Sequence, residues 1–347
     1  MEQAALQVPA DQAKDTIAEL YAAHPLSLDA SKNIRLLTKA PSTTANPQDI
    51  EFDINVISLS DNPEYTALSY VWGTDEPNQI IRINGEAFPV RKNLFDFLQE
   101  YWRRDRSDAL WIDAICINQT SIPERNHQVA MMGDIYLQAS LVISWLGAES
   151  ELVKAFGQLF DCEKRDLKDL TKVYGPVLCD AEYWHRAWIT QEFSLPKNIE
   201  IWCGIETRSF ESIRSRAVFI GKKSPRPGDD QQRMFYLASL RTGYQRSLWD
   251  GYSLQTFLIL LGQGLRTRCS DVRDRIYSLL ALFNPEELKK HPIVVDYGLS
   301  PTETFLALQA AYGGWMGAIA TVRLARLLEI HEDPLVEQYV KDHSNTE

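Results

Sequence analysis

Two groups of polar side chains stand in apolar surroundings and could do chemistry. The first is Asp113, because every other residue of the run Ala109–Ile115 is apolar. A carboxylate buried in such a run costs free energy unless it is paired or hydrogen-bonded. We therefore expect Asp113 either to bind a ligand hydroxyl and organise a site, or to accept hydrogen bonds from the N–H groups of a neighbouring loop.

The second group is the segment Trp184–Glu192. Trp184, Trp188 and Glu192 are four residues apart, which on one continuous helix places them along one face. A carboxylate beside an indole is partly desolvated, so its pKa rises and it becomes suited to acid–base work or to stabilising a developing cation. The alternative is that the tryptophans belong to the core and that Glu192 pairs with an arginine from the C-terminal half.

The elements that must position these groups indicate an α/β sheet. Near-continuous apolar runs alternate with amphipathic segments, which is typical of a parallel sheet covered on both faces. Ligands bind at the carboxyl ends of such strands, where loops and helix N-termini meet. The strands predicted here are 65–71, 109–115, 141–146 and 199–203, and the segments that leave the first three of them are 69–73, 113–119 and 145–147.

Further elements follow from spacing and turn signals. Alternating β-branched runs predict strands at 34–38 and 50–57, and Asn84-Gly85 predicts a type I′ hairpin over 79–90. The helices predicted are 93–103, one that begins after Ser121, 182–195, 234–244, 254–261, 272–283 and 302–330, with a surface loop at 222–233.

Composition excludes several classes of protein. The 347 residues have a net charge of -11, which repels nucleic acid. The five cysteines contain no CxxC pair, so no disulfide framework or zinc site is indicated.

No Walker, GxGxxG, HExxH or GxSxG motif occurs, which argues against an ATPase, dehydrogenase, metalloprotease or serine esterase. The N-terminus lacks a signal sequence, and the uncharged run 304–322 is interpreted as a buried helix rather than a membrane span. We expect a cytoplasmic protein.

Several unusual motifs occur in an order that resembles the fungal heterokaryon-incompatibility (HET) domain. They are Tyr65–Gly73, Asn84-Gly85, Val90–Leu94, Trp111–Gln119, Trp145–Gly147 and Arg186–Glu192. The resemblance spans about residues 34–206, and 271–282 with 295–297 resemble the helical segment that often follows this domain. We therefore expect an N-terminal extension at 1–33, a HET domain at 34–206 and a helical C-terminal region at 207–347.

The resemblance implies a role in nonself recognition between fungal individuals, in which the domain is the effector of programmed cell death. The family is distantly similar to TIR domains, which are flavodoxin-like α/β modules, and some of these cleave NAD. The expected fold is therefore a TIR/flavodoxin-like, mostly parallel sheet flanked by helices, with a β-hairpin insertion and a helical C-terminal region.

The TIR analogy also assigns residues. It implies that Glu192 is the catalytic residue of an NAD glycohydrolase, holding the ribose hydroxyls and stabilising the oxocarbenium-like transition state. NAD is then a substrate, with no further cofactor and no metal. The nucleotide-binding residues that we predict are Ser69, Tyr70, Trp72, Gly73, Asp113, Asn118, Gln119 and Trp188. For Asn118 and Gln119 the alternative is that they only build the turn into the next helix.

Two non-enzymatic readings stay open. The domain could signal without catalysis, through self-association or a regulatory protein partner. It could instead be a sensor that binds a nucleotide and does not cleave it.

Overall fold

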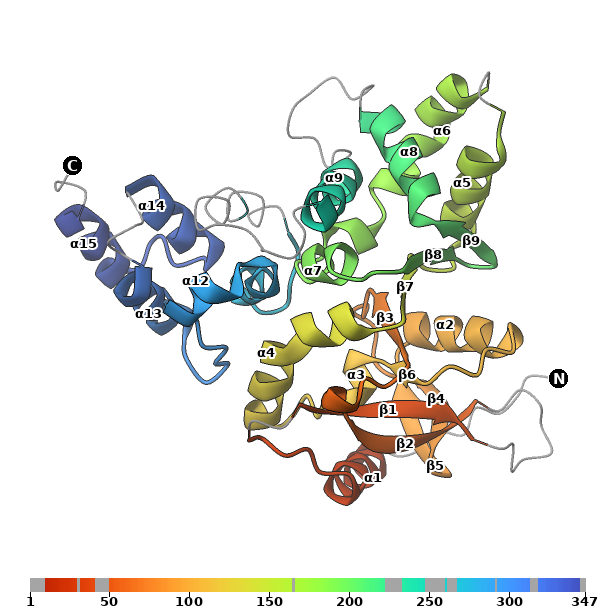
Figure 1. The fold of residues 1–347 in the computed structure, drawn as a ribbon, viewed down its shortest axis with the longest axis horizontal. Coiled ribbons are helices and arrows are strands. Elements are labelled where there is room, and N and C mark those ends of the chain that lie inside the picture. Colours follow the sequence, from red (N-terminus) through yellow and green to blue (C-terminus); the bar gives the residue numbers. More distant parts are fainter. Residues whose placement is uncertain are drawn as a thin grey trace.

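The computed structural model describes residues 10–29, 32–40, 50–163, 166–221, 233–246, 260, 267–290, 292–312 and 318–343. Within these ranges, nine strands form one sheet in the order β5-β4-β2-β1-β6-β3-β7-β8-β9 (Figure 1). The strands are β1 (Asn33–Lys39), β2 (Glu51–Ser58), β3 (Thr66–Tyr70), β4 (Gln79–Ile83), β5 (Glu86–Val90), β6 (Leu110–Trp111), β7 (Leu141–Trp145), β8 (Ile199–Cys203) and β9 (Glu206–Ser209).

The sheet is mixed rather than mostly parallel. Strands β6, β3, β7 and β8 run parallel to one another and form its centre. Outside this centre, β1 is antiparallel to β2 and β6, and the hairpins β4–β5 and β8–β9 are antiparallel. Neighbouring strands that are joined by a short turn must be antiparallel, as in the hairpins β4–β5 and β8–β9. The strands on either side of the four parallel strands therefore make the sheet mixed. The α/β class is confirmed, and the parallel part is limited mainly to the centre.

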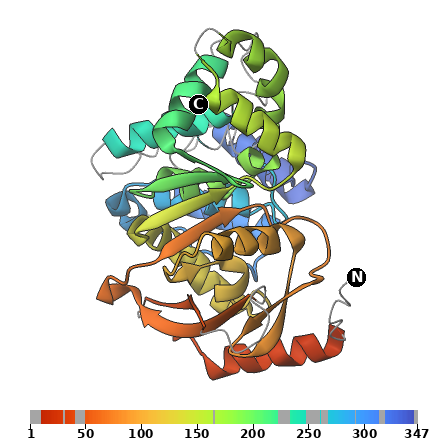
Figure 2. The same ribbon diagram turned by 90° about the vertical axis from the view of Figure 1, so that its right-hand side faces the viewer.

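The described helices surround this sheet and continue beyond it. They are α1 (Ala10–Ala23), η1 (Leu59–Asp61), α2 (Lys92–Arg103), α3 (Asp113–Cys116), α4 (Ile122–Gln138), α5 (Ser150–Asp161), α6 (Leu167–Cys179), η2 (Glu182–His185), α7 (Ile189–Ser194), α8 (Phe210–Gly221), α9 (Arg233–Arg246), α11 (Asp274–Tyr277), η4 (Leu280–Leu282), α12 (Pro285–Lys290), α13 (Pro301–Tyr312), α14 (Ala318–Leu327) and α15 (Pro334–His343). Figure 2 shows α1 and the α5, α6 and α8 group at opposite ends of the molecule.

Several predicted elements are confirmed. The hairpin turns at Asn84 and Gly85, whose φ angles of 52° and 81° are those of a type I′ turn. Helix α2 begins one residue before the predicted start, and α4 follows Ser121, whose hydroxyl accepts the N–H of Glu124. The prediction of one helix over 302–330 was wrong, because α13 and α14 are two helices that pack against each other, with Gln309 Nε2 3.4 Å from Thr321 Oγ1. The predicted loop 222–233 except Arg233, and the predicted helix 254–261 except Leu260, lie outside the described residues.

Further predictions were wrong in detail. The helix 272–283 is present only as the short segments α11 and η4. The strand 109–115 is reduced to β6, because Asp113 Oδ1 accepts the N–H of Ala114 and so begins the helical turn α3. The helix 182–195 is interrupted, because Arg186 is extended with ψ 144° between η2 and α7. The interruption is held by Arg268, whose backbone N–H donates to His185 O and whose carbonyl accepts the N–H of Ala187.

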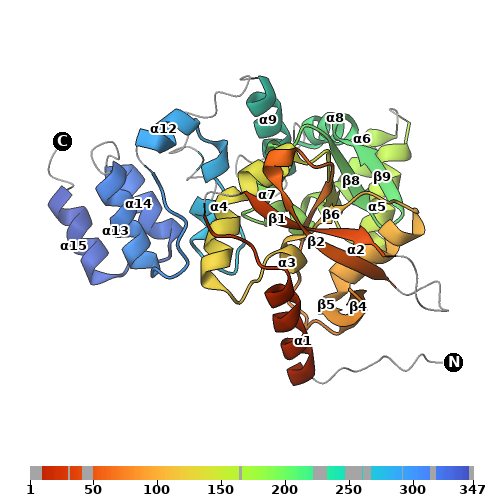
Figure 3. The same ribbon diagram turned by 60° about the horizontal axis from the view of Figure 1, so that its bottom comes forward.

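Two hydrophobic cores hold the chain. The first lies around the sheet and includes Met234, Leu237 and Ala238 of α9. The second is built by the C-terminal helices, with Ile276 and Phe305 fully buried in it. Figures 1 and 3 show α12–α15 together on the side of α4 away from β8 and β9. Within the part of the chain that the structure describes, no helix is long and apolar enough to cross a membrane.

Candidate functional site

Glu192 lies at the centre of a closed polar network. Helix α7 packs against β3 and β7, and this packing leaves Glu192 with none of its surface exposed. Arg186 Nη1 and Nη2 approach its two carboxylate oxygens at 2.8 and 3.2 Å, the two-pronged geometry that makes such pairs strong. Ser69 Oγ donates to Glu192 Oε2 at 2.5 Å and lies 2.9 Å from the hydroxyl of Tyr183. Protein groups therefore engage both oxygens of Glu192.

Asp113 is the second buried carboxylate at this edge of the sheet. Trp72 Nε1 donates to its Oδ2 at 3.0 Å and the N–H of Ala114 to its Oδ1 at 2.8 Å. Burial and the negative charge of Glu192 raise the pKa of Asp113 to about 7, against the lowering effect of Arg186 and of the two hydrogen bonds. Two carboxylates thus share the positive charge of one arginine.

The other predicted residues serve different contacts. Tyr70 is buried, and its pKa is raised well above the ordinary value by that burial and by the charge of Asp113. Asn118 Oδ1 accepts from the backbone and the hydroxyl of Thr120, and Gln119 Nε2 donates to the carbonyl of Asp113. Asn118 and Gln119 therefore contribute to the turn between α3 and α4.

Of the two tryptophans, Trp188 has the predicted position relative to Glu192 and Trp184 does not. The Glu192 N–H donates to the Trp188 carbonyl at 3.2 Å, so these residues are one helical turn apart. Trp184 lies before the interruption, and its indole N–H donates to the carbonyl of Leu178. The prediction of one helix face shared by all three residues was wrong for Trp184. The expected arginine partner in the C-terminal half is replaced by Arg186, six residues before Glu192, which sequence reasoning did not assign.

An open cleft lies beside the network. After β3 the chain passes through β4, β5 and α2 to β6, which lies beside β3 on the side away from β7. After β7 it passes to β8, which lies beside β7 on the side away from β3. The chain connections therefore run in opposite directions from the boundary between β3 and β7. Ligands of open α/β sheets bind at such a switch point. A cleft of about 960 Å³ lies there, lined by Val71 and Gly73 after β3 and by Leu146 and Ala148 after β7. Among the predicted site residues, only Gly73 lines it.

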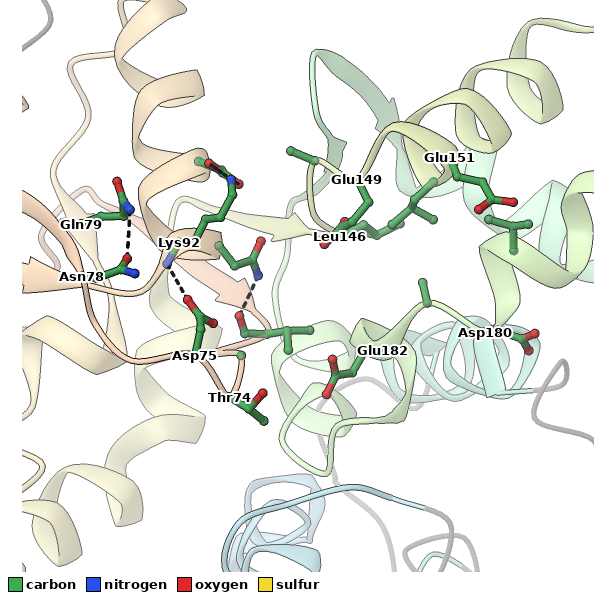
Figure 4. Close-up of a pocket in the computed structure, with 18 residues that line it drawn as sticks. Thr74, Asp75, Asn78, Gln79, Lys92, Leu146, Glu149, Glu151, Asp180 and Glu182 are labelled. Carbon is green, nitrogen blue, oxygen red and sulfur yellow. Dashed lines mark hydrogen bonds and ion pairs between the residues drawn. The ribbon is translucent and has the colours of Figure 1, made fainter. Parts of the chain in front are cut away.

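The cleft is strongly acidic. Its lining carries one lysine, Lys92, and six carboxylates, which are Asp75, Asp96, Glu149, Glu151, Asp180 and Glu182. Lys92 Nζ forms an ion pair with Asp96 at 2.7 Å, and the backbone N–H of Lys92 donates to the carboxylate of Asp75. Figure 4 shows Lys92 and Asp75 on one side of the cleft, and Glu149, Glu151, Asp180 and Glu182 around the other. This charge opposes the binding of a phosphate group.

The C-terminal region contacts the Arg186–Glu192 segment directly. Trp188 and Tyr297 both hydrogen-bond to Asp274, Tyr297 through its hydroxyl at 2.5 Å. Burial raises the pKa of Asp274 to about 6. On the neighbouring face, the guanidinium of Arg125 stacks 3.9 Å from the centre of the Tyr297 ring. The predicted site segment is therefore held from two sides, by the sheet and by the C-terminal helices.

This architecture and its buried network coincide with a family match. Residues 65–192 match the model of the family described as heterokaryon incompatibility protein (HET). The chain thus contains a segment that matches the HET domain, and this segment runs from the residue before β3 to Glu192.

A named relative agrees with this assignment. The chain is 37% identical over 132 residues to "Heterokaryon incompatibility protein 6, OR allele" of Neurospora crassa. The aligned part covers 34% of this chain and 19% of that protein, so the chain corresponds to a minor part of its relative's length. No solved structure matches the chain.

Proposed function

We propose that this chain acts in heterokaryon incompatibility, in the cytoplasm, with its HET domain as the effector that triggers cell death. The observation that carries the proposal is the family match over 65–192, together with the name of the Neurospora relative, a heterokaryon incompatibility protein. In this proposal residues 34–206 are the effector unit and residues 207–347 hold it through contacts such as Trp188–Asp274.

We further propose that the effector acts through protein contacts, by self-association or with a regulatory partner, rather than through chemistry at Glu192. Glu192 has no exposed surface, and its carboxylate is held by Arg186 and Ser69. A carboxylate that stabilises a developing cation on a substrate must be able to approach it. The burial of Glu192 therefore supports a structural role for this residue.

NAD cleavage by a TIR-like mechanism is the second candidate. It is supported by the one-turn relation of Trp188 to Glu192 and by the four parallel strands at the centre of the sheet. It requires that the ion pair of Arg186 with Glu192 opens to admit the nicotinamide ribose. The neighbouring cleft adds a second cost, because its carboxylates repel the pyrophosphate of NAD. The same repulsion counts against a nucleotide sensor.

Growth of fungal cells that overexpress the full chain tests the proposal. We expect growth arrest and cell death with NAD levels unchanged before death begins. Glu192→Gln keeps the shape of the side chain, and Glu151→Gln, at an exposed position, is the matched control. Normal growth of cells that accumulate folded wild-type protein would contradict the effector role. A fall in NAD that precedes death, and that Glu192→Gln abolishes without loss of folded protein, would favour the enzyme.

A further inference from the structure

A small, partly enclosed cavity lies between the first core and the C-terminal region, and its described lining includes neither Glu192 nor a residue of the acidic cleft. It has room for about one water-sized group, with a volume of about 10 Å³ for the centre of that group. Its polar lining comes from Thr190, Arg233, Tyr236, Thr267, Arg275 and Ser278, and the remaining lining is leucine. Among the described residues, the lining therefore contains two guanidinium groups and four hydroxyl groups, but no carboxylate.

One of the two arginines is buried without a counter-charge. Arg233 is 7% exposed, and it donates to the carbonyl of Trp184 and to the hydroxyl of Thr190, both of which are neutral. Across the described ranges, no carboxylate lies within salt-bridge distance of it, whereas Arg275 is paired with Glu329 at 2.8 Å. Burial lowers the pKa of Arg233 to about 10, so the group still carries its charge at neutral pH. An unpaired buried cation is costly, and an anion would compensate it.

A hydroxyl in the same lining has no partner. Ser278 is 1% exposed, and among the described atoms its Oγ makes no hydrogen bond. Buried hydroxyls are almost always hydrogen-bonded, so a lone one that lines a cavity beside a bare cation points to an occupant. The Ser278 hydroxyl can donate a hydrogen bond to an anion in the cavity, and the Arg233 guanidinium can donate a second one.

We propose that this cavity binds a single small anion of the size of chloride. The volume is close to the minimum that holds one water molecule, which favours a monatomic anion over a phosphate, a sulfate or a carboxylate-bearing metabolite. A water molecule would fit and would satisfy Ser278, but it would leave the charge of Arg233 unbalanced. The anion would contact Thr190 of α7, which is two residues before Glu192, together with residues of α9 and of the C-terminal end of α11. It would therefore stabilise the packing of the two cores against each other.

The proposal is tested by thermal unfolding of the full chain at constant ionic strength, with gluconate replaced stepwise by chloride. A ligand that binds only the folded state stabilises it as its concentration exceeds the Kd, so Tm is expected to rise with chloride and with bromide. Sulfate stabilises folded proteins by exclusion from their surface, so any rise in Tm that it gives is expected to be linear in its concentration and not to follow a binding curve with a Kd. A Tm that is the same in chloride and in gluconate would overturn the proposal and leave water as the occupant.

Two serine variants locate the effect. Ser278→Ala removes one hydrogen bond to the anion and is expected to move the chloride dependence to concentrations about tenfold higher. Ser194→Ala is the matched control, because Ser194 is also a buried serine whose hydroxyl lacks a partner among the described atoms, and it does not line the cavity. Equal chloride dependence in both variants would show that the anion binds elsewhere.

Bromide gives a direct readout that does not depend on any variant. In crystals of the wild-type chain grown with bromide, an anomalous peak is expected between Arg233 and Ser278. A map with no peak in this cavity would overturn the proposal even if Tm depends on chloride.

Discussion

The Glu192 network and the switch-point cleft lie at the same edge of the sheet and differ in almost every respect. The network is closed, and its ion pair joins side chains that are 13% and 0% exposed. The cleft is open, and its one ion pair, Lys92 with Asp96, joins side chains that are 68% and 22% exposed. The difference shows that the predicted catalytic residue is enclosed by protein groups, whereas the accessible surface nearby is lined by carboxylates that lie outside the recognised motifs.

Breaking each ion pair gives the largest expected difference between the two regions. Arg186→Met leaves the Glu192 charge buried and unpaired, so we expect a loss of about 3–5 kcal/mol in the free energy of unfolding. Lys92→Met breaks the exposed pair and is expected to cost about 0–1 kcal/mol. Urea denaturation of the two variants measures both values. Similar small losses would mean that Glu192 is not the buried centre of the network.

The pH dependence of stability sharpens the comparison further. The pKa of Asp113 is about 7 in the folded chain and near 3.8 in the unfolded chain, so the folded state binds more protons between these values. Stability from this group is therefore present below pH 4 and is lost as the pH rises to 7. Because Asp113→Asn does not titrate, we expect it to gain on the order of 3 kcal/mol relative to wild type between pH 4 and 8.

Denaturation of wild type and Asp113→Asn at a series of pH values measures this difference. Asp96→Asn, in the solvated cleft, is the matched control and is expected to show a much smaller change over the same range. Parallel pH profiles for wild type and Asp113→Asn would contradict the burial of that carboxylate beside Glu192.

The smallest expected effect lies in the cleft. Asp75 Oδ2 accepts the N–H of Lys92 at the first turn of α2, and its loss in Asp75→Ala is expected to cost about 1 kcal/mol in unfolding free energy. The aromatic near-ultraviolet signal of the core is expected to stay unchanged. A loss as large as that of Arg186→Met would show that the cleft, too, is part of the structural framework.

The sequence predicted most of the framework that carries these regions. Apolar runs predicted β3, β7 and β8, and the Asn84-Gly85 turn predicted the hairpin, because both signals are local. What failed depended on distant partners. The spacing of Trp184 and Trp188 suits one helix, but the backbone of Arg268, more than eighty residues later, interrupts it. The position of the cleft agrees with the predicted segments 69–73 and 145–147, but its acidic character was not predicted, because its carboxylates come from separate segments with no common motif.

We propose that Glu192 stabilises the folded chain and does no chemistry. The most direct test of this proposal is nicotinamide release from NAD by the purified, concentrated full chain, with folded Glu192→Gln protein as the comparison. We expect no release above background from either protein. Release by the wild type that disappears in a folded Glu192→Gln protein would contradict the account and make Glu192 the catalytic residue of an NAD glycohydrolase.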